Sequence, residues 1–342
     1  MKDRLKRYKD AIIFGSRQKR KGNFVSINVF SPVAVFLRIT AFHGVTRTVH
    51  HAIACVALCV CVVSHPTFAA DTPYYGGFGP GFLHLNSDGT YGKGEIRSGD
   101  LGCTFYGPQF GGPYNFKMYV RYDNGELTRD LVANDASGVK VKYLPLFPKC
   151  QYEFEHHDVP LQVRMEAFAP WIPGDSKMSS LPVLFFDFEI TNPDATEKTA
   201  ALAFAIPNPE SDGGKAVIEK DGTVAGAILQ SKRAGGGTLC GIVHNDGDAK
   251  TSWGDGFAKG ELHGESGNMI ASSVVVPGGK TRHILFVFAW DFPVYVSGDG
   301  REWPRKELGH YHNNFYRGAD AIALDCRDRY PTIHAGVNAW FC

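Results

Sequence analysis

Apolar and polar residues alternate along two central stretches of the chain, which is the pattern of half-buried β-strands. In residues 161–167, Leu161, Val163 and Met165 alternate with polar side chains. Residues 183–190 begin apolar on both faces and alternate only towards the end, so we expect a strand that starts deep in a core and emerges towards solvent. A loop rich in Pro, Gly, Asp and Ser joins the two strands.

The same pattern continues through the rest of the chain after residue 70, where turn sequences separate many short apolar runs. We expect further strands at residues 82–85, 91–96, 116–122, 126–132, 139–146, 151–155, 200–206, 224–230, 238–244, 269–276 and 282–290. Residues 86–89 and 123–125 end in Asp-Gly and Asn-Gly, which are typical of hairpin turns. Many short strands without intervening helices predict an all-β fold, a large antiparallel β-sandwich over residues 71–318.

The periodicity changes near the C-terminus. From Ala319 onward apolar residues recur at spacings of three and four, the period of a helix; they are Ile322, Cys326, Tyr330, Ile333, Val337 and Trp340. We expect Asp320 to cap the first helix and Pro331 to kink the segment or begin a second helix. Because residues 319–342 stop on apolar side chains, we expect a short, truncated helical linker whose apolar face, with Ile333, Val337, Trp340 and Phe341, is partly uncovered.

The first 70 residues differ from the rest in charge and hydropathy. They hold 11 of the 36 Lys and Arg residues but only two of the 35 Asp and Glu residues. Residues 52–63 form an apolar run of twelve, which is too short to span a bilayer comfortably and is typical of a signal peptide. We expect a signal peptide at 49–70, cleaved near Ala69 or Ala70, and a secreted or periplasmic protein; a membrane anchor is the alternative. Residues 1–48 are expected to be an unstructured extension or to follow a misplaced start codon.

The composition excludes several classes of function. After residue 70 the net charge is −8, so the chain lacks the excess of Lys and Arg that nucleic-acid binding requires. The five cysteines after the signal, at positions 103, 150, 240, 326 and 342, have no C-x-x-C spacing, which gives no support for zinc or thioredoxin chemistry and favours packing roles. The glycine run 76–81 does not match the dinucleotide fingerprint. We therefore expect no cofactor and no metal.

Several carboxylates and histidines are candidates for catalysis or metal binding. Glu166 and Asp175 flank the central loop, and Asp187 and Glu189 share one strand face; a retaining glycosidase needs two such carboxyls about 5–5.5 Å apart. Structural carboxylates are the favoured interpretation, with Asp175 holding the loop as an Asx-turn residue. Residues 156–158, His-His-Asp, offer metal ligands, but adjacent strand residues point to opposite faces, so a loop is favoured over a metal site.

Four ordered segments resemble one enzyme family. The central segment 168–193 carries P-x-I-P-G-D, S-S-L-P-V and T-N-P; the others are a glycine-rich opening at 76–81 with Asp88-Gly89, Phe147-Pro148 before a strand, and A-W-D-x-P within 288–293. Together they resemble the N-terminal region of glycoside hydrolase family 116, the non-lysosomal glucosylceramidase or bile-acid β-glucosidase type. The resemblance covers residues 74–330.

The resemblance implies that catalysis and structural support belong to different domains. In the family, an (α/α)6 barrel carries the nucleophilic Glu and the acid/base Asp, and neither position exists in this sequence, so no catalytic residue is expected here. The resemblance implies a non-catalytic sandwich that supports such a barrel, in cis or as a separate chain, with a glycan or glycolipid as the ligand of the whole enzyme. A stand-alone secreted carbohydrate-binding or structural module is the alternative, and an enzyme with its own site in the sandwich has no motif behind it.

Four residues of the central loop are the candidate contacts with substrate or with another domain. Trp171 lies between two prolines and could stack on a sugar face, whereas Trp290 lies in an apolar strand and is expected in the core. Asp175, Ser179 and Ser180 are polar residues of the same loop. We expect Trp171, Asp175, Ser179 and Ser180 to form a substrate rim or an interdomain loop.

Overall fold

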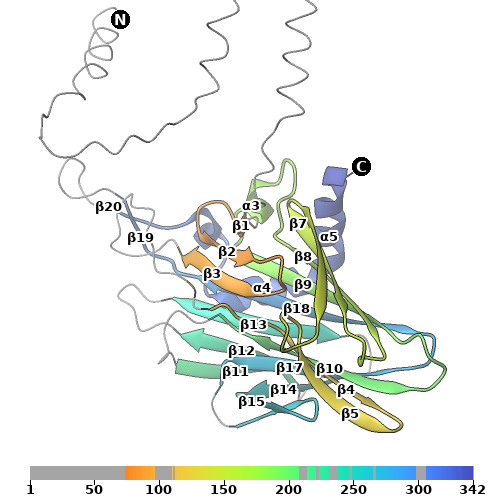
Figure 1. The fold of residues 1–342 in the computed structure, drawn as a ribbon. Coiled ribbons are helices and arrows are strands. Elements are labelled where there is room, and N and C mark those ends of the chain that lie inside the picture. Colours follow the sequence, from red (N-terminus) through yellow and green to blue (C-terminus); the bar gives the residue numbers. More distant parts are fainter. Residues whose placement is uncertain are drawn as a thin grey trace, which may run out of the picture. The chain divides into compact units, whose positions relative to one another are not determined.

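The computed structural model describes residues 74–96, 110, 112–207, 214–220, 223–230, 237–245, 249–264, 267–297 and 306–341 (Figure 1). The expected N-terminal extension at 1–48 and signal peptide at 49–70 lie outside these residues. The described part belongs to one compact unit, Ala69–Cys342. Within it, no helix is both long and apolar enough to cross a membrane.

Two large antiparallel sheets form the body of this unit. One has eight strands in the order β11 (Gly214–Lys220), β12 (Thr223–Gln230), β13 (Thr238–Asn245), β18 (Thr281–Asp291), β9 (Val183–Thr191), β8 (Gln162–Phe168), β7 (Lys149–Glu155) and β6 (Lys140–Leu146). The other has five strands in the order β14 (Lys250–Gly254), β17 (Met269–Val276), β10 (Lys198–Ala205), β4 (Lys117–Tyr122) and β5 (Gly125–Asp130). The prediction of a large antiparallel β-sandwich is confirmed.

Smaller elements complete the fold. A three-stranded sheet joins β1 (Tyr74–Tyr75), β2 (Gly81–Leu85) and β3 (Tyr91–Ile96), and two hairpins pair β15 (Gly256–Ala258) with β16 (Glu261–His263) and β19 (Tyr295–Ser297) with β20 (Lys306–Leu308). The turn between β2 and β3 depends on Gly89, which has a φ of 91° and whose position would bring a Cβ within 2.7 Å of a backbone oxygen. The expected Asp-Gly hairpin turn is present.

The core between the two sheets is built from aromatic rings. Alternate residues of β9 and β18 point inward, so Phe186, Phe188, Phe286 and Phe288 lie together and are fully buried. Trp290 continues this row, and its indole N–H donates to the carbonyl oxygen of Pro80 at 3.1 Å. Burying each such ring stabilises the fold by roughly 1.5–3 kcal/mol. Trp290 is therefore a core residue, as expected.

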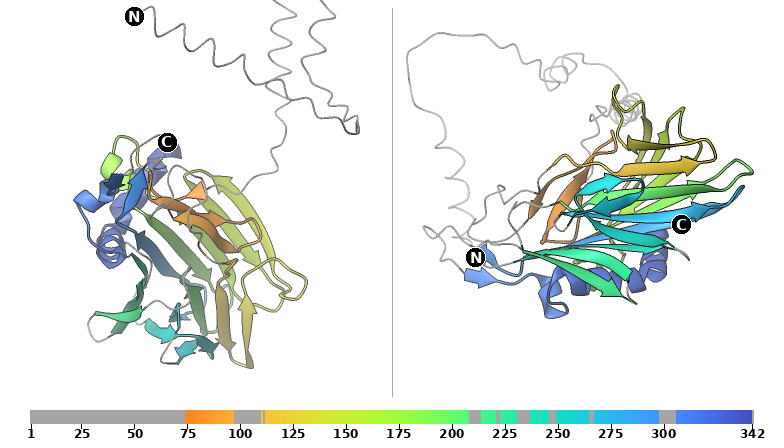
Figure 2. Two further views of the ribbon diagram at one scale, coloured as in Figure 1. Left: turned by 90° about the vertical axis from the view of Figure 1, so that its left-hand side faces the viewer. Right: turned by 90° about the horizontal axis from the view of Figure 1, so that it is seen from below.

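The outer face of the eight-stranded sheet is covered by helices α4 (Ala319–Asp328) and α5 (Tyr330–Asn338), which run along one side of the sandwich (Figure 2). The outward residues of the central strands meet the helices in a second core, which contains Phe185, Val287, Ile322, Ile333 and Val337 among others. This second layer explains why β9 starts apolar on both faces. Its outward residues further along, Asp187 and Glu189, are only half-buried, so the expected emergence towards solvent is confirmed.

The helical segment differs in two ways from expectation. Ile333 and Val337 are 1% and 0% exposed, so the sheet covers this face, and only Trp340 and Phe341 beyond it remain about half exposed. Pro331 lies in the first turn of α5, so it begins a second helix, which is one of the two alternatives expected from the sequence. The expected Asp320 cap is wrong: the N-cap of α4 is Gly318, and Asp320 lies inside the first turn. At this end of α4, the N–H of Gly318 donates to Asp291 of β18 and the N–H of Ala319 donates to Thr238 of β13, so side chains of the sheet bond the start of the helix.

Three of the cysteines lie within the described residues. Cys150, Cys240 and Cys326 are buried and free, and burial raises the pKa of each thiol. A buried, protonated thiol behaves as a small apolar side chain, which agrees with the expected packing role. Cys103 and Cys342 lie outside the described residues.

Candidate functional site

The loop between β8 and β9 is stabilised by a one-turn helix, α3 (Ser176–Ser179). Asp175 is its N-cap, and its Oδ1 accepts a hydrogen bond from the backbone N–H of Met178 at 2.9 Å. Gly174 precedes it with a φ of 78°, a left-handed conformation that favours glycine. Asp175 thus holds the loop by a side-chain to backbone contact, as expected for an Asx-type residue.

Ser179 and Ser180 of the loop are both buried. The Oγ of Ser179 accepts from the backbone N–H of Ile172 at 3.0 Å and lies 3.2 Å from the carbonyl oxygen of the same residue, to which it donates. The Oγ of Ser180 donates to the carbonyl oxygen of Lys177 at 2.8 Å. These bonds satisfy backbone groups of the loop and fix its shape. A role of Ser179 and Ser180 in a rim or an interdomain contact stays a prediction.

Trp171 is held between two other rings. Its indole N–H donates to the carbonyl oxygen of Gly76, next to β1. The ring centroid of Phe78 lies 4.0 Å from that of Trp171, and the centroid of Phe147 lies 5.0 Å away in an edge-on arrangement. The indole is only half-buried. Because two rings contact it, Trp171 is one member of an aromatic cluster, and its contact with a substrate or with another domain stays a prediction.

This cluster continues into the last residues of the chain that the structure describes. The indole N–H of Trp340 donates to the carbonyl oxygen of Trp171 at 2.6 Å, and the ammonium of Lys149 lies 4.9 Å from the ring centroid of Phe341. We call Phe78, Phe147, Trp171, Trp340 and Phe341 the aromatic end. The four phenylalanine and tryptophan side chains other than Trp171 are 46–55% exposed. The sequence identified Trp171 as a candidate contact and placed Trp340 and Phe341 on a partly uncovered apolar face, but it did not show that these rings lie together, because they come from distant segments.

A second cluster lies where α5 crosses β7, β8 and β9. The carboxylate of Glu166 contacts the ammonium of Lys149 at 2.9 Å, the imidazole of His334 at 2.8 Å and the amide of Gln151 at 3.1 Å. Burial alone would raise the pKa of Glu166, but the hydrogen bonds from His334, Lys149 and Gln151 outweigh it and lower the pKa to about 2. Glu166 is therefore ionised at neutral pH and is bonded to α5 through His334.

Glu166 lies directly opposite Asp187 in the pairing of β8 with β9, so two carboxylates share one face. The hydroxyl of Tyr330, on α5, donates to Asp187 Oδ2 at 2.5 Å, and His283 lies 3.5 Å from Asp187 Oδ1. A shallow hollow of about 450 Å³ lies over this face. A glycosidase acid needs a raised pKa, whereas that of Glu166 is lowered. The pair attaches α5 to the sheet, and Glu166 does not have the raised pKa that a glycosidase acid requires.

A third polar cluster connects the end of β18 to the helical segment. Asp291 Oδ1 accepts from Asn313 at 2.8 Å and contacts the imidazole of His312 at 3.0 Å, and its Oδ2 accepts from the Gly318 N–H at 2.8 Å. Burial opposes ionisation, but these donors outweigh it and lower the pKa of Asp291. His312 and Asp291 are both buried. The cluster positions the 3-10 turn at Tyr311–Asn314 and the start of α4.

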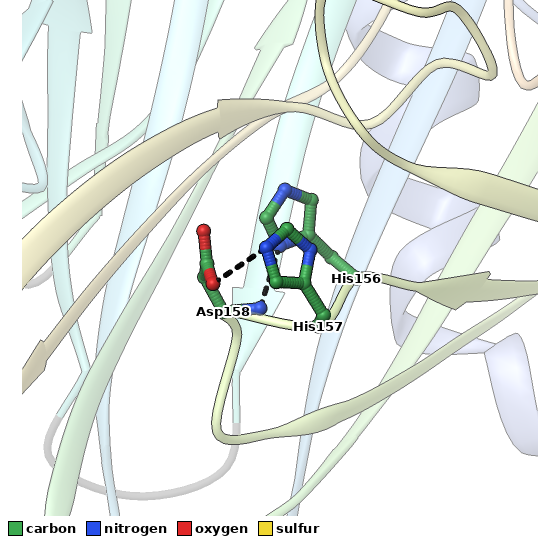
Figure 3. Close-up of side chains that lie close together, drawn as sticks. All are labelled: His156, His157 and Asp158. Carbon is green, nitrogen blue, oxygen red and sulfur yellow. Dashed lines mark hydrogen bonds and ion pairs between the residues drawn. The ribbon is translucent and has the colours of Figure 1, made fainter.

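His156, His157 and Asp158 lie in a turn after β7, with the two imidazole rings stacked at 4.8 Å (Figure 3). These residues lie in a turn, as the favoured loop interpretation expects, so the rule that adjacent strand residues point to opposite faces does not apply to them. His156 nevertheless has both nitrogens engaged: Nδ1 accepts from the Asp158 N–H at 3.0 Å, and Nε2 lies 3.0 Å from the carbonyl oxygen of Ser137. Asp158 also lies 3.6 Å from the guanidinium of Arg129. These contacts fit a cluster that stabilises the loop, the interpretation favoured from the sequence.

Comparison with known sequences gives one match. Residues 75–333 match the profile of a family described as beta-glucosidase 2, glycosyl-hydrolase family 116 N-term. The matched range runs from β1 into α5, so it includes the sandwich, the central loop and α4. No curated protein matches the sequence.

Solved structures share only distant similarity. A polysaccharide lyase is 11% identical, with 64% of this chain and 34% of that chain covered and a TM-score of 0.37. The GH36 α-galactosidase AgaA from Geobacillus stearothermophilus is 10% identical, with 64% and 40% covered and a TM-score of 0.32. Heparinase III is 11% identical, with 47% and 23% covered and a TM-score of 0.31. The chain thus spans less than half the length of each of these proteins.

Proposed function

Because this chain belongs to the glycosyl-hydrolase family 116 N-terminal family, we propose that it is the non-catalytic β-sandwich of a β-glucosidase or glucosylceramidase type of enzyme. In this proposal it supports an (α/α)6 catalytic domain, present in cis or as a separate chain. The single observation that carries the proposal is the family match from residue 75 to residue 333. The substrate of the complete enzyme would be a β-glucoside carried on a glycan or a glycolipid.

The chemistry of the polar clusters favours a structural role for this domain over a catalytic one. Glu166 and Asp187 face each other, but each is bonded to α5, and the pKa of Glu166 is about 2. A general acid must hold its proton near neutral pH, and such a carboxyl does not. These groups therefore attach the helices to the sheet, and the resulting rigid body is suited to supporting another domain.

Export is part of the same proposal. The apolar run and the small residues that follow it near Ala69 are the features that support a signal peptide. The enzyme would then act outside the cytoplasm, in a secreted or periplasmic location.

A turnover assay tests the proposal. The full chain, a separately produced (α/α)6 catalytic domain of a family 116 β-glucosidase, and their mixture would be assayed on an aryl β-glucoside. We expect no turnover from the chain alone and a longer half-life of catalytic-domain activity in the mixture. Turnover by the chain alone that disappears in a Glu166→Gln variant would contradict the proposal, because the sandwich would then contain its own site.

The stand-alone module makes a different prediction in the same samples. Isothermal titration of the full chain with cello-oligosaccharides would show saturable binding if the chain were a carbohydrate-binding module. Such binding, together with no effect on the catalytic domain, would favour the module.

A further inference from the structure

Exposed aromatic rings gather at one end of the sandwich, from four separate chain segments. Phe78 comes from the turn after β1, Phe147 from the β6–β7 turn, Trp171 from the central loop, and Trp340 and Phe341 from the residues after α5. Figures 1 and 2 show β1, α3 and the C-terminal end of α5 together at this end. Trp340 bonds to Trp171 across 169 positions of sequence, through the indole N–H of Trp340 and the backbone carbonyl oxygen of Trp171.

Hydrogen bonds to the backbone hold three residues of the aromatic end in place. Trp171 donates to Gly76, Trp340 donates to Trp171, and the backbone N–H of Phe78 donates to the carbonyl oxygen of Ser179 at 2.9 Å. Side chains that are already ordered lose little conformational entropy when a partner binds, which favours association. The aromatic end is therefore a preformed apolar surface.

The size of this surface suits a protein contact. Phe and Trp side chains each bury 150–250 Å² when fully covered, and four of these rings are about half exposed. The exposed apolar area is thus on the order of 400 Å². The largest apolar patch on a typical monomer has a similar area, and patches of that size are often functional. A standard interface buries about 800 Å² on each partner, so the aromatic end could form its apolar centre.

We infer that the aromatic end is the surface on which the catalytic domain docks, an inference that rests on the proposed function. Two observations favour a protein domain over a sugar. The ring centroids of Phe78 and Phe147 lie 4.0 and 5.0 Å from that of Trp171, so two protein rings already contact the indole on which a pyranose would stack. The last described residues, Trp340 and Phe341, themselves belong to the surface, so a domain joined after residue 342 would begin beside it.

The occupant is then an apolar, helix-built face of the catalytic domain, with Lys149 and Lys177 close by. Lys149, under the Phe341 ring, is buried and already paired with Glu166. Lys177 of α3, in the same loop as Trp171, lies over the Phe315 ring at 4.6 Å, and its ammonium predicts a carboxylate on the partner at the border of the interface.

Binding of matched variants tests the inference. The full chain and two variants, the double variant Phe78→Ser with Phe341→Ser and the control Val275→Ser, would be titrated by biolayer interferometry with the family 116 catalytic domain as the probe. Val275 is 44% exposed on β17, outside the aromatic end, and matches the substituted rings in exposure. We expect the double variant to bind at least tenfold more weakly and the control to bind like the unaltered chain. Thermal melts establish that the variants fold.

The other outcomes separate the inference from the proposed function. Equal binding by all three chains would overturn the docking surface and leave the proposed function standing, whereas no binding by the unaltered chain would overturn both. Hydroxyl-radical footprinting of the unaltered chain gives a test without substitutions: Phe78, Phe147 and Trp340 must become protected when the catalytic domain is added. Protection by a second copy at high chain concentration, or by cello-oligosaccharide, would instead assign the surface to self-association or to sugar and overturn the inference.

Discussion

The substitution Glu166→Gln removes one negative charge from the cluster that attaches α5 to the sheet. It leaves the ammonium of Lys149, whose side chain is 11% exposed, with Asn338 and the Phe341 ring but without a carboxylate. A carboxyl whose pKa falls from 4.5 to about 2 on folding stabilises the folded state by about 3 kcal/mol at neutral pH. Partial solvent exposure reduces this to about 2 kcal/mol. We therefore expect the variant to be about 2 kcal/mol less stable at pH 7.

The assay is thermal unfolding of the full chain, followed by circular dichroism. A loss of about 2 kcal/mol lowers Tm by roughly 4–8 °C in a domain of this size. Since the folded-state pKa of Glu166 is depressed, its contribution is fully present above pH 4.5 and is lost as the pH falls towards 2. The difference in Tm between the two chains should therefore shrink across that window.

A matched control is available on the neighbouring strand. Glu155 pairs with Lys142 on the surface, where both side chains are about half exposed or more. Because exposed pairs contribute little, Glu155→Gln should leave Tm unchanged within error. If Glu166→Gln and Glu155→Gln had the same effect, or if the effect of Glu166→Gln did not depend on pH, the assignment of Glu166 as the ionised anchor of α5 would be refuted.

Three further predictions follow from the fold and the sequence. Tyr330→Phe removes the hydrogen bond to Asp187 but keeps the ring, so urea unfolding should show a loss of about 1 kcal/mol; no change would mean that water replaces the bond. Deleting residues 319–341 uncovers the outer face of the eight-stranded sheet, so the deleted chain should scatter light or melt early, and a soluble deletion with an unchanged Tm would contradict the second core. N-terminal sequencing of exported protein should give a start near Ala69 or Ala70, and an N-terminus before residue 50 would remove the signal peptide.

The strand pattern could be predicted where burial alternates cleanly. In β8, Val163 and Met165 face the core while Arg164 faces outward, so a period of two was visible in the sequence. The sequence did not predict seven strands: β1, β11, β14, β15, β16, β19 and β20. Six of them have only two to five residues, which carry too little periodicity, whereas β11 has seven. The sequence also did not predict that the sheet covers α5, because this contact joins residues that are distant in sequence.

The candidate site was predicted only in part. Trp171 and Asp175 could be identified because they lie in one loop with distinctive turn residues. The grouping of Phe78 and Phe147 with Trp340 is a tertiary contact, and no local pattern connects these three positions. Glu166 and Asp187 lie opposite each other because of the register between β8 and β9, and strand periodicity alone does not predict that register.

The central claim is that this sandwich supports a catalytic domain, and calorimetry tests it most directly. A ligand that binds only the folded state stabilises it by about 2.7 kcal/mol when present at 100 times its Kd. The Tm of an isolated family 116 catalytic domain should therefore rise progressively as the full chain is added. A catalytic-domain Tm that stays constant at every chain concentration would contradict the account.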